Sequence, residues 1–247
     1  MAIDDNIRVV LVNTSHPGNI GAVARAMKNM CLSNLTLVEP KSFPDEEARA
    51  RASGAEDILQ KAVVVDDLAS AVSDCQYVVG TTARERSVQW TLFDPRGCGE
   101  FAVAQASAGA QVAIVFGREN SGLTNEELDL CTHMIHIPAN PNYSSLNIAM
   151  AVQVVCYEVM MSMPKEGAEL TSVPNEREPA SHKHMESFFA HLEQALRDTS
   201  FMSEDGAEKL MRRLRRLFHR AEPDADELNI LRGILSAFQG RKSMRRD

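Results

Sequence analysis

The sequence predicts an α/β domain with a mostly parallel β-sheet, followed by a small all-α domain. Short apolar, β-branched runs alternate with helical stretches along the first two thirds of the chain, as in a parallel sheet covered on both faces. Past a segment rich in proline and charge, only helical periodicity remains. We therefore expect an α/β domain over residues 1–163, a linker over 164–180 and a helical extension over 181–247.

Six apolar runs are predicted strands: Ile7–Val12, Leu35–Val38, Val63–Val65, Tyr77–Val79, Val112–Phe116 and Met134–Ile137. Helical stretches lie between most of them, near Ile20–Met30, Ala48–Leu59, Leu68–Val72 and Glu100–Ala108. The last helix of this domain, Leu146–Met161, is apolar almost all round. Such a helix is buried on every side, which in a small α/β domain indicates a subunit interface. We therefore expect a homodimer.

The segment from Pro164 to Pro179 has three prolines, many charges and no periodicity, as linkers do. Three amphipathic helices are expected after it, marked by Met185, Phe188, Phe189, Leu192 and Leu196, then by Leu210, Leu214, Leu217 and Phe218, then by Leu228, Leu231, Leu235 and Phe238. Asp224 and Glu227 resemble a capping box that opens the third helix. His182 and His184, close to the linker, are expected to be solvated.

Composition indicates an ordinary globular protein, with 44% apolar and 24% charged residues among 247. The acidic N-terminus lacks a signal-peptide pattern, and Leu146–Met161 is too short and too interrupted by polar residues to span a membrane. Five cysteines, odd in number and far apart, predict free thiols in a reducing cytoplasm. No metal is expected, because His133 and His136 would face opposite sides of one strand.

The charge is distributed unevenly. The net charge is −8, but from Lys209 onward 11 Lys and Arg stand against 5 Asp and Glu. The first 208 residues carry 15 basic and 29 acidic residues. A basic end on an acidic body predicts that any contact with a polyanion is local. A solvated helix face is the alternative interpretation of the basic end.

Three segments place small or polar residues where a strand should meet a helix: Asn19–Arg25, Phe116–Thr124 and Tyr143–Ala151. In an alternating α/β chain, ligands bind at such junctions, because the carboxyl ends of the strands open into a crevice there. Three junctions along one chain predict a single composite site. The usual dinucleotide and nucleoside-triphosphate fingerprints and the G-x-S-x-G elbow are absent from the sequence.

On the helix that contains the first segment, Gly18, Gly21 and Arg25 share one face. An arginine above a glycine floor lets a phosphate or a backbone come close, although a loosely packed helix start would give the same pattern. In the second segment, Gly117 and Gly122 suit a tight turn around Glu119, which alternatively is a solvated surface carboxylate. The hydroxyl-rich third segment suits polar ligand atoms at a helix N-terminus, or only caps the helix.

Together the segments resemble the three signature motifs of the SpoU branch of the SPOUT RNA methyltransferases, over roughly residues 5–162. The motif N-x-G-x-x-x-R is met at Asn19, Gly21 and Arg25, F-G-x-E-x-x-G from Phe116 to Gly122, and S-L-N-x-A from Ser145 to Ala149. The helical extension, with its Leu214–Phe218 and Glu227–Leu235 segments, resembles that of the bacterial tRNA (cytidine/uridine-2′-O-)-methyltransferases of this branch. These act on the first nucleotide of the anticodon loop.

The resemblance implies a SPOUT fold with a C-terminal trefoil knot, a dimer whose active sites are completed across the interface, and S-adenosylmethionine as cofactor. The implied cofactor contacts are Thr81, Thr82, Ala83, Gly117, Ile137, Ser144, Ser145 and Leu146. The implied function is 2′-O-methylation of nucleotide 32, C or U, in tRNA. A methyltransferase of ribosomal RNA, a non-catalytic RNA-binding protein with this fold and a small-molecule α/β enzyme are the alternatives.

The catalytic candidates are Arg25, Glu119 and Asn147. The family's usual proposal makes the arginine at Arg25 the proton acceptor, but a guanidinium has a pKa above about 12 and almost no neutral fraction at pH 7. We expect Arg25 instead to stabilise the developing alkoxide and grip a phosphate, with Glu119 and Asn147 orienting the substrate. The expected RNA contacts are Arg84, Arg86, Lys209, Arg212, Arg213, Arg215, Arg216 and Arg220.

Overall fold

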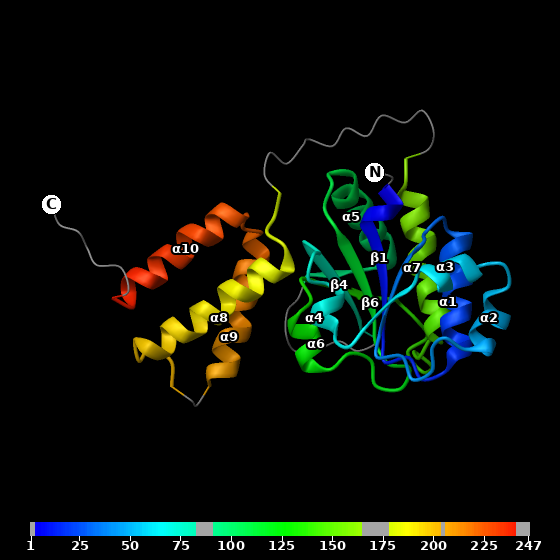
Figure 1. Cartoon of the computed structure of the whole chain (residues 1–247), viewed down its shortest axis with the longest axis horizontal. Helices are drawn as coiled ribbons and strands as arrows, with labels where there is room; N and C mark the ends of the chain where they lie inside the picture. The colour runs from blue at the N-terminus through cyan, green and yellow to red at the C-terminus, as the bar shows by residue number, and fades with distance from the viewer. Residues whose placement is uncertain (1–2, 83–90, 165–177, 204–205, 241–247) are drawn as a thin grey trace. The chain divides into compact units, whose positions relative to one another are not determined.

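The computed structural model describes residues 3–82, 91–164, 178–203 and 206–240. It divides into two compact units, Met1–Asn175 and Glu176–Asp247, and the division falls within the predicted linker (Figure 1). The first unit holds the sheet and the second holds three helices. Ala83, Arg84 and Arg86 lie outside the described residues.

A seven-stranded sheet forms the centre of the first unit, and every strand pairing in it is parallel, as predicted. The spatial order of the strands is β3-β2-β1-β6-β4-β7-β5. Their bounds are β1 Ile7–Val12, β2 Asn34–Val38, β3 Val63–Val65, β4 Tyr77–Thr82, β5 Leu92–Phe93, β6 Val112–Phe116 and β7 His133–His136. All six predicted strands are present, and β5 was missed because two residues carry no periodicity. The trefoil knot stays a prediction.

Helices cover both faces of this sheet (Figure 1). Their bounds are η1 Ile3–Asn6, α1 Pro17–Asn29, α2 Glu46–Ala52, α3 Glu56–Lys61, α4 Leu68–Ala71, α5 Pro95–Ser107, α6 Asn125–Asp129 and α7 Ile148–Ser162. One buried cluster joins the sheet to α1, α2, α3, α5 and α7, and a second joins its other face to α4 and α6. Because Val9 faces the first cluster and Val10 the second, β1 is buried on both faces and is apolar from Val9 to Val12.

The single helical stretch predicted over Ala48–Leu59 was wrong. Two left-handed residues, Ser53 (φ 44°) and Gly54 (φ 93°), end α2 and separate it from α3. An α-helix cannot continue through such residues.

Within the chain, helix α7 buries one face only, and burial of its other face by a second subunit stays a prediction. Its inner residues are Ile148, Val152, Val155, Cys156 and Val159, and the helix packs against α1 and α5. Its outer face exposes an apolar stripe at spacings of four, three and four residues: Met150, Val154, Tyr157 and Met161. We call these four residues the α7 stripe.

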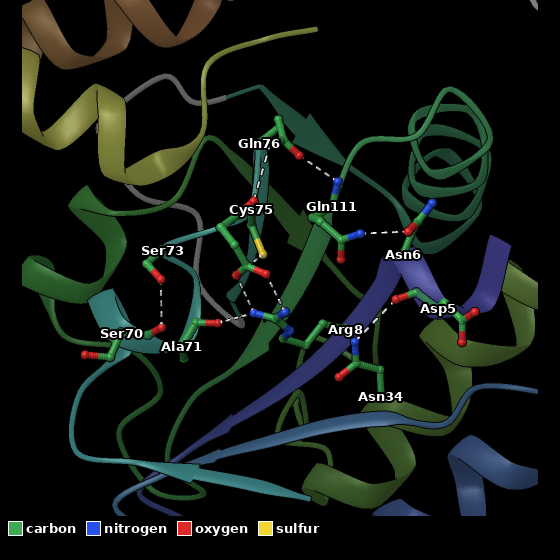
Figure 2. A network of polar contacts seen from close by, with 11 residues as sticks. Asp5, Asn6, Arg8, Asn34, Ser70, Ala71, Ser73, Cys75, Gln76 and Gln111 are labelled. Carbon is green, nitrogen blue, oxygen red and sulfur yellow. Dashed lines mark hydrogen bonds and ion pairs between the residues drawn. The ribbon is translucent and has the colours of Figure 1, made fainter. Parts of the chain in front are cut away.

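A polar network ties the amino ends of the central strands together (Figure 2). Arg8 of β1 donates to both carboxylate oxygens of Asp74, at 2.8 and 2.9 Å, and to the Ala71 carbonyl at 2.6 Å. The hydrogen bond from Arg8 lowers the pKa of the Asp74 carboxyl. Gln111 donates from its side chain to Asn6 at 2.7 Å and from its backbone to Gln76 at 2.7 Å. This network connects β1, β4 and β6 at their amino ends, opposite the carboxyl ends of the strands.

The second unit contains α8 His182–Asp198, α9 Ala207–Ala221 and α10 Ala225–Phe238 around a core that includes Phe188 and Phe189. The predicted capping box of Asp224 and Glu227 is confirmed. His182 is buried at 3% exposure, so the expectation that it is solvated was wrong, whereas His184 is exposed. Among the described residues, no helix of either unit is long and apolar enough to cross a membrane.

Buried His133 on β7 makes the stability of the first unit depend on pH. It lies among the rings of Tyr77, Phe93 and Phe101, and burial lowers its pKa to about 4 from 6.5. Between these values the unfolded chain binds a proton that the folded chain does not, so acid favours unfolding. We expect the contribution of His133 to the free energy of unfolding to be fully present above pH 6.5. It should be lost progressively towards pH 4, by up to about 3 kcal/mol.

Urea unfolding of the wild-type chain and of His133→Phe at pH 7 and at pH 4.5 measures this contribution. The variant should lose less stability between the two pH values, whatever its absolute stability. An equal loss in both proteins would contradict the assignment to His133.

Candidate functional site

The three segments that the sequence analysis identified meet at the carboxyl ends of the strands. The side-chain amide of Asn19 donates to Glu119 Oε1 at 3.0 Å, and its oxygen accepts from the amide of Asn147 at 3.1 Å. These residues stand 100 and 128 positions apart in the chain. The predicted composite site is therefore present as one hydrogen-bonded unit, which we call the Asn19 bridge: Glu119, Asn19 and Asn147.

Glu119 is a held carboxylate rather than a solvated surface group. Both of its oxygens accept from the Ser15 backbone amide at 3.2 Å, in addition to the bond from Asn19. Partial burial raises the pKa of the Glu119 carboxyl, but the bonds from Asn19 and from the backbone outweigh it, so the net pKa lies below its usual range. Glu119 is thus an anion at neutral pH, suited to positioning the loop after β1 and unsuited to donating a proton.

The turn around Glu119 is rigid. Backbone bonds join Arg118 and Gly122 in both directions, at 2.9 and 3.2 Å, and the Arg118 guanidinium binds both oxygens of Glu127 at 2.8 and 2.9 Å. Gly122 has a φ of +71°, as its sequence position predicted. Gly117 is needed for space instead, because a Cβ there would lie 2.3 Å from the Gly122 carbonyl carbon. Glu127 also forms a capping box with Thr124 at the start of α6.

This turn borders a cavity of about 330 Å³ at the ends of β4, β6 and β7. Seven of the eight predicted cofactor residues line it: Thr81, Thr82, Gly117, Ile137, Ser144, Ser145 and Leu146. Sequence reasoning missed Leu123, Leu128 and Ile148, which supply apolar walls. Leu123 and Ile148 directly follow a motif turn and a helix cap, whereas Leu128 is only the apolar residue of the short helix α6. The cavity suits a ligand that has both polar and apolar parts.

A second hollow, of about 840 Å³, lies between α1, α2 and the start of α7. We call it the α1–α2 groove. Arg25, Asn19 and Asn147 line it, whereas Glu119 lines the first cavity, so the Asn19 bridge stands between the two. Arg25 is exposed and has no hydrogen bond or ion pair with any residue that the structure describes.

The glycine floor expected beside Arg25 is only partly open, because Gly18 lines the α1–α2 groove whereas Gly21 is covered by α2. Gly18 and Gly21 are buried, and a Cβ on Gly21 would lie only 2.0 Å from the Ala48 carbonyl oxygen of α2. The small residue is required because a second helix, not a phosphate, comes close there. Helix α2 thereby becomes a wall of the groove.

The predicted RNA contacts on α9 divide into two groups. Lys209, Arg213 and Arg220 are exposed and Arg216 is half-buried, whereas Arg212 is paired with Glu208 at 2.8 Å. Arg215 belongs to the fold of its own unit, since its guanidinium binds both oxygens of Glu186 and lies 4.5 Å from the centre of the Phe189 ring. We therefore revise its expected role from RNA contact to packing of α8 on α9.

Comparison with known families places residues 6–157 with the "SpoU rRNA Methylase family" and residues 183–247 with "tRNA methyltransferase TrmJ, C-terminal domain". The chain is 51% identical over 243 residues to "tRNA (cytidine/uridine/adenosine-2′-O-)-methyltransferase TrmJ" of Pseudomonas aeruginosa, covering 95% of this chain and 94% of the relative. It is 52% identical over 235 residues to "tRNA (cytidine/uridine-2′-O-)-methyltransferase TrmJ" of Escherichia coli K12, covering 95% of each.

Among solved structures, the chain resembles TrmJ from Zymomonas mobilis ZM4, with a TM-score of 0.81 and 33% identity. The match covers 94% of this chain and 98% of the other. A probable methylase family protein from Haemophilus influenzae matches at a TM-score of 0.60 and 46% identity, over 96% and 97% of the two chains.

The close contact at Gly21 predicts a large effect of one methyl group. In Gly21→Ala the new Cβ meets backbone rather than a flexible side chain, so α1 and α2 must separate. We expect a loss of about 1–3 kcal/mol in the free energy of unfolding, as for overpacked cores. Chemical denaturation measures the loss, and Ala22→Ser on the next, half-buried position is the control. Equal stability of Gly21→Ala and wild type would contradict the contact.

Proposed function

The chain belongs to the SpoU methylase family, and on that premise we propose that it methylates a ribose 2′-hydroxyl of tRNA with S-adenosylmethionine as methyl donor. The observation that carries the proposal is the Asn19 bridge, which joins all three family motifs in one site. We place the target at nucleotide 32, the first of the anticodon loop, with C or U as base, and the reaction in the cytoplasm. The name of the Pseudomonas relative adds adenosine, so acceptance of a purine is a question for the assay.

The first cavity has the chemistry that this methyl donor needs. Its volume of about 330 Å³ falls in the range of small-molecule sites. Leu123, Ile137 and Leu146 offer apolar contact for an adenine ring, while Ser144, Ser145 and the loop backbone offer polar contact for ribose and amino-acid groups. When bound, S-adenosylmethionine supplies a methyl group activated by a sulfonium.

The chain's own residues supply orientation and charge. Arg25 is a fixed cation at the groove, so it stabilises an alkoxide developing on the ribose and holds the neighbouring phosphate. The proton then leaves to phosphate or water. Asn147 and Glu119 act through the Asn19 bridge: their hydrogen bonds to Asn19 fix the position of the cavity relative to the groove. Alignment of this kind contributes up to roughly 7–11 kcal/mol in the most favourable intramolecular reactions.

A homodimer through α7 is part of the proposal. The α7 stripe leaves four apolar side chains exposed along one helix face, from 37% at Val154 to 63% at Met150. A second copy of the same face would cover it, and contiguous exposed apolar residues mark interfaces. The trefoil knot implied by the family belongs to the same proposal.

The second unit is proposed to bind tRNA through Lys209, Arg213, Arg216 and Arg220 of α9. Its match to the C-terminal domain of a tRNA methyltransferase favours tRNA over ribosomal RNA, although the family of the first unit is described by ribosomal RNA. A purely binding protein is disfavoured because Arg25, Glu119 and Asn147 are all present and assembled.

Incubation with tritiated S-adenosylmethionine and unmodified tRNA transcripts tests the reaction, with mapping of the methylated nucleotide. We expect label on the 2′-oxygen of nucleotide 32, reduced roughly 100- to 1,000-fold in Arg25→Ala, as on loss of one transition-state donor. Arg49→Gln, on α2 outside the groove, should retain activity. Label on ribosomal RNA alone, or none on any RNA, would overturn the proposed function.

Neutralising α9 tests the second unit. In Arg213→Gln/Arg216→Gln/Arg220→Gln, tRNA affinity should fall, and each lost phosphate contact should reduce the slope of log affinity against log salt by about 0.7 to 0.9. The affinity for the methyl donor should be unchanged, because these residues lie outside the first unit. Arg197→Gln, an exposed arginine of α8 paired with Glu193, is the control. Wild-type tRNA affinity in the triple variant would contradict the role of α9.

A further inference from the structure

Two arginines of the first unit differ from the others. Of the six that the structure describes there, four are paired with carboxylates: Arg8 with Asp74, Arg49 with Glu46, Arg96 with Glu158 and Arg118 with Glu127. Arg25 and Arg51 have no ion pair or hydrogen bond with any described residue. Both are exposed, and both line the α1–α2 groove. The only arginines left unpaired among the described residues of this unit are therefore gathered at one place.

The close contact of α1 and α2 explains how they come together. Gly21 packs against Ala48 and Ala52 of α2. Arg25 lies four residues after Gly21 on α1, and Arg51 lies three residues after Ala48 on α2. Residues at these spacings share a helix face, so each arginine emerges on its helix beside the same contact. The motif glycine thus places Arg51, which belongs to no family motif, in the groove that contains Arg25.

The groove is a cationic site on an acidic body. None of its lining residues within the described part of the chain is Asp or Glu, although 29 of the first 208 residues are acidic. Its other polar walls are His16 and four side-chain amides, Asn19, Asn29, Asn147 and Gln153, and amides bind phosphate and sugar oxygens without adding charge. Two unpaired guanidiniums in such a place favour a ligand with more than one phosphate.

We propose that Arg51 holds a second phosphate of the RNA, next to the one at Arg25, so that the α1–α2 groove is a two-phosphate track for the strand that carries the target ribose. This inference rests on the proposed function and deepens it. Arg51 is a positioning residue: it fixes the register of the strand, and Arg25 acts at the reacting nucleotide. Sequence specificity does not come from such contacts.

The competing occupant is a second copy of the chain. Met150 and Val154 of the α7 stripe also line the groove, so a partner subunit that covers the stripe adjoins it. If Arg51 instead contacts that partner, its loss would change the oligomeric state rather than RNA binding.

The test compares full-length wild type with Arg51→Gln, Arg51→Lys and Arg49→Gln. Arg49 is the matched control, because it lies on the same helix, is exposed and is paired with Glu46 outside the groove. The measurements are tRNA affinity at several salt concentrations, KM and kcat for tRNA methylation, affinity for S-adenosylmethionine, and mass in solution by light scattering.

We expect Arg51→Gln to raise the Kd and the KM for tRNA by roughly 3- to 10-fold, more than it lowers kcat, as for one solvent-exposed charged contact. Its salt slope should fall by about 0.7. Arg51→Lys should restore the slope, since the charge returns, and Arg49→Gln should match wild type.

Equal tRNA affinity and salt slope in Arg51→Gln and Arg49→Gln, with an active wild type, would overturn the two-phosphate track and leave the proposed function standing. A change from dimer to monomer in Arg51→Gln would assign Arg51 to the subunit interface and also overturn it. A wild-type chain that neither binds nor methylates tRNA would overturn both proposals together.

Discussion

The site depends on one side-chain amide. Asn19 gives a hydrogen to Glu119 and accepts one from Asn147, which an amide can do because it carries a donor and an acceptor a short distance apart. A carboxylate at this position could not donate to Glu119, and an aliphatic side chain could do neither. The first turn of α1, the turn after β6 and the N-cap of α7 are joined through this group. The first cavity and the α1–α2 groove consequently lie on either side of the Asn19 bridge.

The amino and carboxyl ends of the strands differ in the interactions that they carry. At the amino ends of the strands, Arg8 and Asp74 form a part-buried ion pair, and Asn6, Gln76 and Gln111 complete the network around them. Such pairs contribute to a defined geometry more reliably than to net stability. At the carboxyl ends of β4, β6 and β7 the first cavity opens, and the Asn19 bridge connects it to the α1–α2 groove. A parallel sheet places the loops that follow its strands at one edge, so residues far apart in sequence converge there.

Charge is used locally on both units. The body is acidic, which disfavours the approach of a polyanion to most of its surface, and the unpaired arginines of the first unit lie in a groove without carboxylates among its described lining residues. On α9, Arg213 and Arg220 are exposed and can contact a polyanion. Arg215 instead binds Glu186 and packs against the Phe189 ring. A count of basic residues along a helix therefore overstates the charge that a polyanion can reach.

Local patterns in the sequence determined every strand except β5, the capping boxes at Thr124 and Asp224 and the three motifs, because these depend on neighbours a few residues away. The alternation of strands with helices along the chain indicated the parallel sheet. Tertiary structure alone decided which helix faces and side chains come into contact. It covered the Gly21 floor with α2, buried His182, left one face of α7 exposed and brought Arg51 beside the site. The physical reason is that periodicity specifies which face of a helix is apolar or small, whereas the partner of that face is set by packing between segments that the sequence separates.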